Sequence, residues 1–173
     1  DRPYVISDFG NKKILKDIIL GNHSSLKGTP HEGHMIDAVM HFAAYTNVNQ
    51  SLENPISYYK NNVSQSLNLL EILCEKDIRA YKKDNLPIPI IFSSSCETYG
   101  LTKSIPIYES APQNPISPYG KSKLCVEMII KDLAKSHNLK SVILRYFNAA
   151  GASEDSLLGE DHNPETHLIP RVI

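Results

Sequence analysis

Hydrophobic residues along this 173-residue chain occur in two alternating patterns. Short continuous apolar runs are typical of buried parallel strands, and apolar residues spaced three or four apart are typical of helices with one buried face. Strands are predicted at 4–7, 38–42, 88–94 and 141–145, and helices at 12–20, 55–74 and 118–137. This alternation predicts an α/β fold with a doubly wound parallel sheet that is covered by helices on both faces.

The ends of these elements carry local signals. Pro89 should lie at the start of its strand, because proline has no amide hydrogen for the sheet ladder. Asn54 before Pro55 marks a helix start with a capping side chain, and Pro118 opens the next helix. The residues of these two helices that are predicted to face the core are Ile56, Tyr59, Val63, Leu67, Leu70, Cys74, Leu124, Met128 and Leu133.

Composition narrows the classes of function. The formal net charge is -1, from 18 basic and 19 acidic residues, so no field attracts nucleic acid or an anionic membrane. No apolar run approaches the roughly 20 residues that cross a bilayer, and the first residues do not read as a signal peptide, which predicts a cytoplasmic protein. No metal site is predicted, because the candidate ligands lack metal-binding spacing: Cys74, Cys96, Cys125, His31 and His34.

Tyr119 and Lys123 are the most informative polar residues. Residues four apart lie on one face of a helix, so the phenol and the ammonium can point into one pocket. A nearby cation is expected to lower the pKa of the tyrosine, which would then accept a proton from an alcohol at neutral pH. Ser95, at the end of the preceding strand, could hydrogen-bond the same oxygen.

Short motifs around these residues follow one another in a recognisable order. They are His41-Phe42-Ala43-Ala44, Tyr58-Tyr59-Lys60-Asn61-Asn62-Val63, Phe92-Ser93-Ser94-Ser95, Tyr99-Gly100, Ser117-Pro118-Tyr119-Gly120-Lys121-Ser122-Lys123 and Arg145-Tyr146-Phe147-Asn148. The series resembles the extended short-chain dehydrogenase/reductase family of NAD-dependent epimerases and dehydratases, and within it the UDP-glucose 4-epimerases. The resemblance implies a partial Rossmann-like NAD-binding domain over 1–173, with the start of the substrate-binding region at about 148–173.

The resemblance also implies a role for each matching residue. The implied catalytic residues are Ser95, Tyr119 and Lys123. The implied NAD-binding residues are Asp8, Phe42, Ala43, Ala44, Asn61, Ser93, Tyr119, Lys123 and Tyr146. The implied substrate-binding residues are Ser95, Glu97, Tyr119, Phe147, Asn148, His167 and Leu168.

By the same resemblance, the intact protein would interconvert UDP-glucose and UDP-galactose with tightly bound NAD, as an isomerase of galactose and nucleotide-sugar metabolism. A homodimer through helices 55–74 and 118–137 is also implied. Three alternatives stay open. They are a 4-epimerase for another nucleotide sugar, a nucleotide-sugar 4,6-dehydratase and a non-catalytic remnant. Dehydratases of the family carry an Asp-Glu pair where this chain has Cys96-Glu97, and a thiol replaces an acid poorly.

One expected feature is missing from the sequence. Family members bind the dinucleotide pyrophosphate through a glycine-rich turn after the first strand, and these residues contain no Gly-x-x-Gly-x-x-Gly pattern. Strand 4–7 would then correspond to the third strand of the fold, with no neighbour on this chain. The interpretation is an incomplete fold that lacks the first two strand and helix units and most of the C-terminal substrate domain, and that is inactive by itself.

Overall fold

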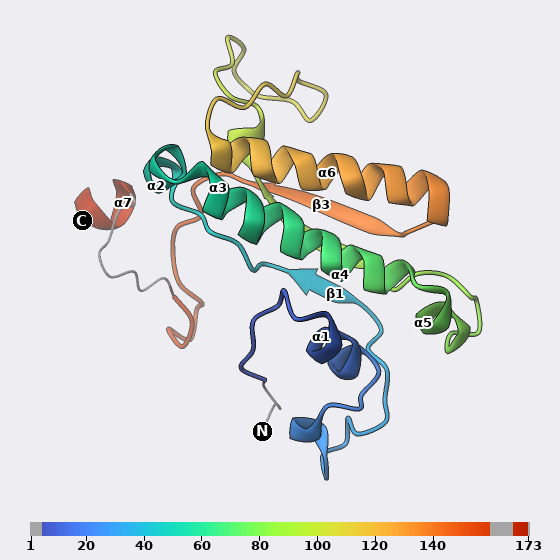
Figure 1. Ribbon diagram of the computed structural model, residues 1–173. Coiled ribbons are helices and arrows are strands. Elements are labelled where there is room, and N and C mark those ends of the chain that lie inside the picture. Colours follow the sequence, from blue (N-terminus) through green and yellow to red (C-terminus); the bar gives the residue numbers. More distant parts are fainter. Residues whose placement is uncertain (1–4, 160–167, 173) are drawn as a thin grey trace.

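The computed structural model describes residues 5–159 and 168–172, which form three strands and a series of helices (Figure 1). The strands are β1 (Val39–His41), β2 (Ile90–Ser95) and β3 (Ser141–Tyr146). The α-helices are α1 (Lys12–Ile19), α2 (Val48–Glu53), α3 (Pro55–Tyr58), α4 (Gln65–Cys74), α5 (Lys76–Ala80), α6 (Pro118–His137) and α7 (Leu168–Val172). Two short 3-10 turns, η1 (Ser24–Leu26) and η3 (Cys96–Thr98), and a π-helical turn, η2 (Tyr59–Ser64), complete the described elements.

The sheet is parallel and has the order β1-β2-β3. Its register pairs Val39 with Ile90 and Ser95 with Tyr146. Pro89 immediately precedes β2, as predicted, and its carbonyl oxygen accepts a hydrogen bond from the Val39 amide (2.9 Å). The parallel α/β arrangement predicted from the sequence is therefore confirmed.

Helices α4 and α6 lie side by side on one face of this sheet (Figure 1). The core between them and the sheet is apolar and includes Ile90, Phe92, Leu70, Val126 and Ile130. Side chains alternate between the two faces of a strand, and the residues that point to the other face, Met40, Val142 and Leu144, are exposed. Within the described residues, helices cover one face of the sheet, so the expected cover on both faces is not found.

The predicted strand 4–7 is wrong for residues 5–7, which lie in irregular backbone before α1, and Tyr4 falls outside the described residues. The described strands pair only with one another, in the order β1-β2-β3. Strand backbone needs a partner for its amides and carbonyls, and segment 5–7 has none among these strands. The sequence pattern was apolar enough for a strand, but none of the described strands pairs with this segment.

The long helix predicted at 55–74 is divided by the π-helical turn η2 and is preceded by the unpredicted α2. Asn54 caps its start, since the Asn54 side chain accepts from the Ser57 amide (3.3 Å). The predicted apolar face is partly wrong, because Ile56, Tyr59, Leu67 and, on α6, Met128 are exposed. The buried face of this helix instead includes polar residues that hydrogen-bond to neighbouring elements, namely Asn62 and Ser66.

Candidate active site

The candidate site lies where the carboxyl ends of the three parallel strands meet, the usual ligand-binding edge of such a sheet. Segments 42–44, 95–97 and 146–148 leave the sheet there. The start of α6 packs directly against η3, and a Cβ atom on Gly120 would lie 2.6 Å from the Glu97 carbonyl oxygen. Only glycine allows this approach, which brings the first turn of α6 beside Ser95.

Tyr119 is buried in the first turn of α6 and is held from several sides. Its amide donates to the Ser51 hydroxyl of α2 (3.2 Å), and its carbonyl accepts from the Ser122 hydroxyl (2.7 Å). The Tyr58 ring packs edge-on against the Tyr119 ring, with centroids 6.5 Å apart. The tyrosine is therefore fixed by backbone contacts and by ring packing.

Lys123 is also buried, and its ammonium does not point to the phenol oxygen as the sequence suggested. Its Nζ atom donates to the Ser93 carbonyl oxygen (2.7 Å) and lies 5.1 Å from the Phe92 ring centre and 5.9 Å from the Tyr119 ring centre. Burial lowers the pKa of Lys123 to about 8, because a charged ammonium loses hydration there. Lys123 thus joins α6 to β2, one turn away from Tyr119.

The pKa of Tyr119 is raised, not lowered as predicted. Burial is the main cause, and the nearby Cys96 and Glu97 add to it, whereas a hydrogen bond with the Ser95 side chain acts in the opposite direction. The prediction of a lowered pKa was wrong for this structure, because the spacing of Tyr119 and Lys123 did not reveal that the phenol is buried. Among the described residues, Ser95 is the group that favours the phenolate.

Ser95 ends β2, and its hydroxyl oxygen accepts from the Glu97 amide (3.2 Å). The Glu97 carboxylate in turn accepts from the hydroxyl of Ser117, the capping residue of α6 (3.4 Å). These bonds hold the turn that follows the strand against the start of the helix. The structure therefore brings together the predicted residues Ser93, Ser95, Glu97, Tyr119 and Lys123.

Asn62 belongs to the motif at 58–63 but not to the predicted site residues, and in the structure it is buried and joins several elements. Its buried amide binds both backbone groups of Tyr45: Oδ1 accepts from the Tyr45 amide (2.8 Å), and Nδ2 donates to the Tyr45 carbonyl (3.0 Å). Nδ2 also donates to Ser122 on α6 (3.1 Å), and Asn61 donates to Asn62 Oδ1 (2.9 Å). Asn62 thus joins the segment after β1 to α6, the helix that carries Tyr119. The sequence signal for this role was the pair of polar residues Asn62 and Ser66, which are four apart and lie on one buried face of the helix.

Glu127 and Arg145 form a second missed group. The Glu127 side chain is fully buried on α6 and makes a two-pronged ion pair with Arg145 of β3 (Nε to Oε1, 3.0 Å; Nη2 to Oε2, 2.8 Å). Glu127 also accepts from Ser94 (2.6 Å) and Gln113 (3.0 Å). The available signal was the acidic Glu127 on the apolar face of the predicted helix 118–137. A buried carboxylate needs a partner, so its position could have indicated a buried ion pair.

The other predicted site residues lie around the rim or outside the described part. Asp8 is exposed, and its carboxylate accepts a hydrogen bond from the Gly10 amide (2.9 Å). Gly10 lies two residues before the start of α1. Phe42, Ala43, Tyr146, Phe147 and Asn148 are exposed at the ends of β1 and β3, and Ala44 is half-buried. His167 falls outside the described residues, and Leu168 is the first residue of α7.

Within residues 5–159 and 168–172, no cluster of three or more histidine, cysteine or acidic side chains could hold a metal ion. No helix in these ranges is long and apolar enough to cross a membrane. The cytoplasmic location stays a prediction.

The sequence matches the NAD dependent epimerase/dehydratase family over residues 7–173. The chain belongs to this family. The UDP-glucose 4-epimerase of Lactobacillus helveticus is 46% identical over 138 residues, which are 80% of this chain and 39% of that protein. This family member therefore spans about two fifths of the length of such relatives.

Solved structures agree with the family assignment. The UDP-glucose 4-epimerase from Brucella ovis in complex with NAD has a TM-score of 0.77 at 41% identity, over 96% of this chain and 45% of that one. The UDP-glucose 4-epimerase from Bifidobacterium longum in complex with NAD+ and UDP has a TM-score of 0.73 at 34% identity, over 91% and 41% of the two chains. The Rossmann-like fold class and its incompleteness relative to these relatives are confirmed.

His41, at the end of β1, gives a prediction for stability against pH. It is buried between the rings of Phe9 and Phe92 (centroids 5.4 and 5.7 Å away). Its Nε2 lies 2.8 Å from the Ser66 hydroxyl, which donates to the Asn62 carbonyl, so Nε2 carries the proton. Burial, followed by the Lys123 cation, lowers the pKa of His41 to about 4.

The unfolded histidine, with a pKa of about 6.5, takes up a proton at a higher pH than the folded one. The neutral His41 therefore stabilises the fold above about pH 6.5, and up to about 3 kcal/mol of stability is lost as the pH falls toward 4. The free energy of unfolding of His41→Gln should depend less on pH than that of the wild type across this range. The control is His137→Gln, at an exposed histidine, which should keep the pH dependence of the wild type. Parallel plots of unfolding free energy against pH for the wild type and His41→Gln would contradict the prediction.

Proposed function

We propose that this chain carries part of the active site of an NAD-dependent UDP-glucose 4-epimerase, which interconverts UDP-glucose and UDP-galactose in galactose and nucleotide-sugar metabolism. The observation that carries the proposal is the meeting of Ser95, Tyr119 and Lys123 between the end of β2 and the start of α6. Family membership and relatives named UDP-glucose 4-epimerase at up to 46% identity support it.

The proposed roles are those that the family resemblance implies, and the positions of these side chains support them. The Tyr119 phenolate takes the proton from the sugar 4-hydroxyl and later returns it. Burial raises the pKa of Tyr119 and opposes ionisation, whereas Ser95, which hydrogen-bonds the same oxygen, favours the charged form. Bound NAD would supply the hydride acceptor for sugar C4 and the donor that returns the hydride to the opposite face. The burial of Tyr119 and Lys123 keeps water from the proton transfer.

The residues present fit NAD at the carboxyl ends of the strands. Phe42, Ala43 and Ala44 follow β1 as a segment with two small side chains, which leaves the backbone open to a flat ligand. Among the described residues Lys123 makes one hydrogen bond, so two of its three donors can hold ribose hydroxyls. Asp8, Asn61, Ser93 and Tyr146 complete the proposed NAD-binding set, in a partial NAD-binding domain over 1–173.

The proposed UDP-sugar site includes Ser95, Glu97 and Tyr119 beside the exposed Phe147 and Asn148. His167 and Leu168 belong to the same proposed set, and the substrate-binding region is proposed to start at about 148–173. The complex of the Bifidobacterium longum relative with NAD+ and UDP supports this assignment.

A homodimer through 55–74 and 118–137 is part of the proposal. In the structure these segments form α3, η2, α4 and α6, and α4 packs against α6. Ile56 and Met128 are 66% and 56% exposed, which leaves apolar side chains on both segments available to a second copy.

The function is tested by incubating the full gene product with UDP-glucose and following UDP-galactose, with the bound dinucleotide measured after denaturation. We expect interconversion and about one NAD per chain. Release of a 4-keto-6-deoxy sugar would indicate the dehydratase, and turnover of UDP-xylose alone would indicate a different 4-epimerase. Protein that holds no dinucleotide and converts none of these substrates would favour the non-catalytic remnant.

A further inference from the structure

The end of β2 is attached to α6 at two consecutive residues. The Ser93 carbonyl accepts from Lys123 Nζ (2.7 Å), and the Ser94 hydroxyl donates to Glu127 Oε1 (2.6 Å). Lys123 and Glu127 are four apart on the buried face of α6, one and two turns after Tyr119. The next residue of the strand is Ser95, so these two bonds set where Ser95 lies relative to Tyr119.

The Glu127 carboxylate is itself fixed. Both of its oxygens bind the Arg145 guanidinium, and Gln113 donates to Oε2. Arg145 is held in turn by the Tyr99 hydroxyl (2.7 Å) and the Glu109 carbonyl (3.2 Å), and its guanidinium stacks 4.9 Å from the Tyr99 ring centre. A carboxylate bound on both oxygens cannot rotate away from Ser94.

Stability alone does not account for this arrangement. A buried ion pair repays little or none of its desolvation cost, and apolar residues of the same volume would be as stable. What the ion pair adds is a defined direction, because hydrogen bonds to a carboxylate require a given geometry and apolar contacts do not. Here the ion pair orients the Glu127 carboxylate toward the Ser94 hydroxyl, and Ser94 is the neighbour of the proposed catalytic residue Ser95.

We propose that Glu127, oriented by Arg145, is a positioning residue for the reaction, and that it acts through the Ser94 hydroxyl to set the distance between the hydroxyls of Ser95 and Tyr119. The inference rests on the proposed epimerase function and adds to it. Glu127 contacts neither substrate nor dinucleotide in this scheme. Its effect on turnover passes through Ser94 to Ser95.

The test uses Ser94→Ala in the full gene product with bound NAD, assayed for UDP-glucose 4-epimerase turnover. Loss of the hydroxyl leaves Glu127 with its Arg145 and Gln113 partners, so the fold should persist. We expect kcat to fall about tenfold, because small misplacements of reacting groups are costly, and KM for the UDP-sugar to change less than about twofold. The matched control is Ser136→Ala, on the exposed side of α6, which should match the wild type.

A double-variant cycle separates positioning from a general structural effect. If Ser94 acts through Ser95, adding Ser94→Ala to Ser95→Ala should change kcat by less than about twofold. The inference would be overturned if Ser94→Ala lowered kcat tenfold both in the wild type and in Ser95→Ala, or if it left the kcat of an active wild type unchanged. Either result would leave the proposed function standing. A wild-type protein without epimerase activity would overturn the proposed function and the inference together.

Discussion

Replacing Tyr119 with phenylalanine is expected to lower epimerase turnover by about 10²–10⁴-fold, the usual contribution of a positioned acid-base group. The substitution removes one oxygen and keeps the ring that packs edge-on against Tyr58. The backbone bonds of Tyr119 to Ser51 and Ser122 do not involve the phenol and should remain. The loss should therefore appear in kcat, measured with saturating UDP-glucose on the full gene product.

The control for Tyr119→Phe is the retention of fold and cofactor. Bound NAD and the unfolding midpoint should match those of the wild type, since Lys123 and Asn62 keep their contacts. Tyr108→Phe, at an exposed tyrosine of the loop before α6, should leave turnover unchanged. Wild-type kcat in Tyr119→Phe would exclude the phenol as the proton acceptor and remove the basis of the proposed mechanism.

Arg145→Met is expected to cost about 3–5 kcal/mol of unfolding free energy. The substitution removes the two-pronged partner of the Glu127 carboxylate, whose side chain is fully buried, and leaves it with the half-exposed Lys131 ammonium at 3.5 Å. It also removes the bonds that Arg145 makes to Tyr99 and Glu109, which hold the segment between η3 and α6 against β3. Denaturant unfolding of wild type and variant measures the difference.

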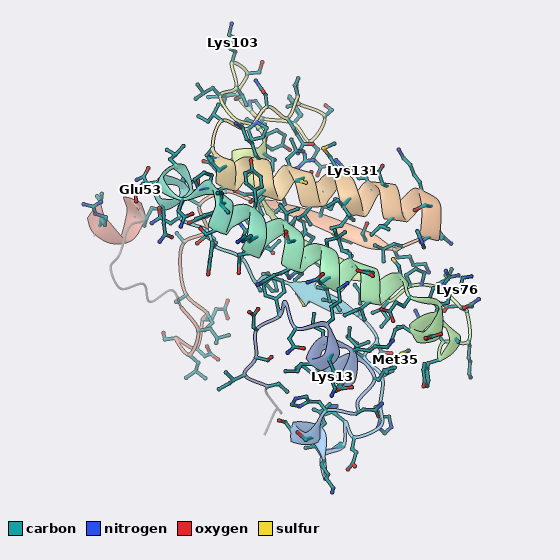
Figure 2. The ribbon with its side chains drawn as sticks, in the orientation of Figure 1. Lys13, Met35, Glu53, Lys76, Lys103 and Lys131 are labelled. Atoms are coloured by element: carbon teal, nitrogen blue, oxygen red, sulfur yellow. The ribbon has the colours of Figure 1, made fainter. Side chains whose placement is uncertain are left out.

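Two further variants test whether the buried charge causes this loss. Combining Arg145→Met with Glu127→Leu should restore at least half of the lost stability, because the poorly paired carboxylate is gone. Lys131 of α6 (labelled in Figure 2) contacts the same carboxylate at 3.5 Å, and its side chain is half-exposed. Lys131→Met should therefore cost less than about 0.5 kcal/mol. A loss of similar size in the double variant and in Arg145→Met would show that packing, and not charge, is responsible.

Local sequence signals predicted the elements well where the governing interactions are themselves local. Pro118 and its capping Ser117 determine the start of α6, and continuous apolar residues determine β2 and β3. Segment 5–7 shows the limit of such signals, since its apolar residues favour a strand but no described strand pairs with it. A strand depends on a partner that a local pattern does not contain.

Buried faces were predicted less well, for a related reason. Ile56, Leu67 and Met128 have the right spacing for a core stripe and are exposed, whereas the polar Asn62 and Glu127 are buried. Hydrophobic spacing assumes that the buried side of a helix is apolar. Next to the candidate site the buried side is polar, because it holds Tyr45, Ser122, Ser94 and Arg145 in place by hydrogen bonds.

The sequence by itself determined most of the alternating elements and the family, and it selected Ser95, Tyr119 and Lys123 as candidate site residues. These follow from short-range spacing and from motifs that persist in order along the chain. The tertiary structure alone decided that Lys123 points to the Ser93 carbonyl, that burial raises the pKa of Tyr119, and that Glu127 connects α6 to β2 and β3. The direction and burial of a side chain depend on residues far away in the sequence, and those neighbours are fixed only when the sheet and its helices pack together.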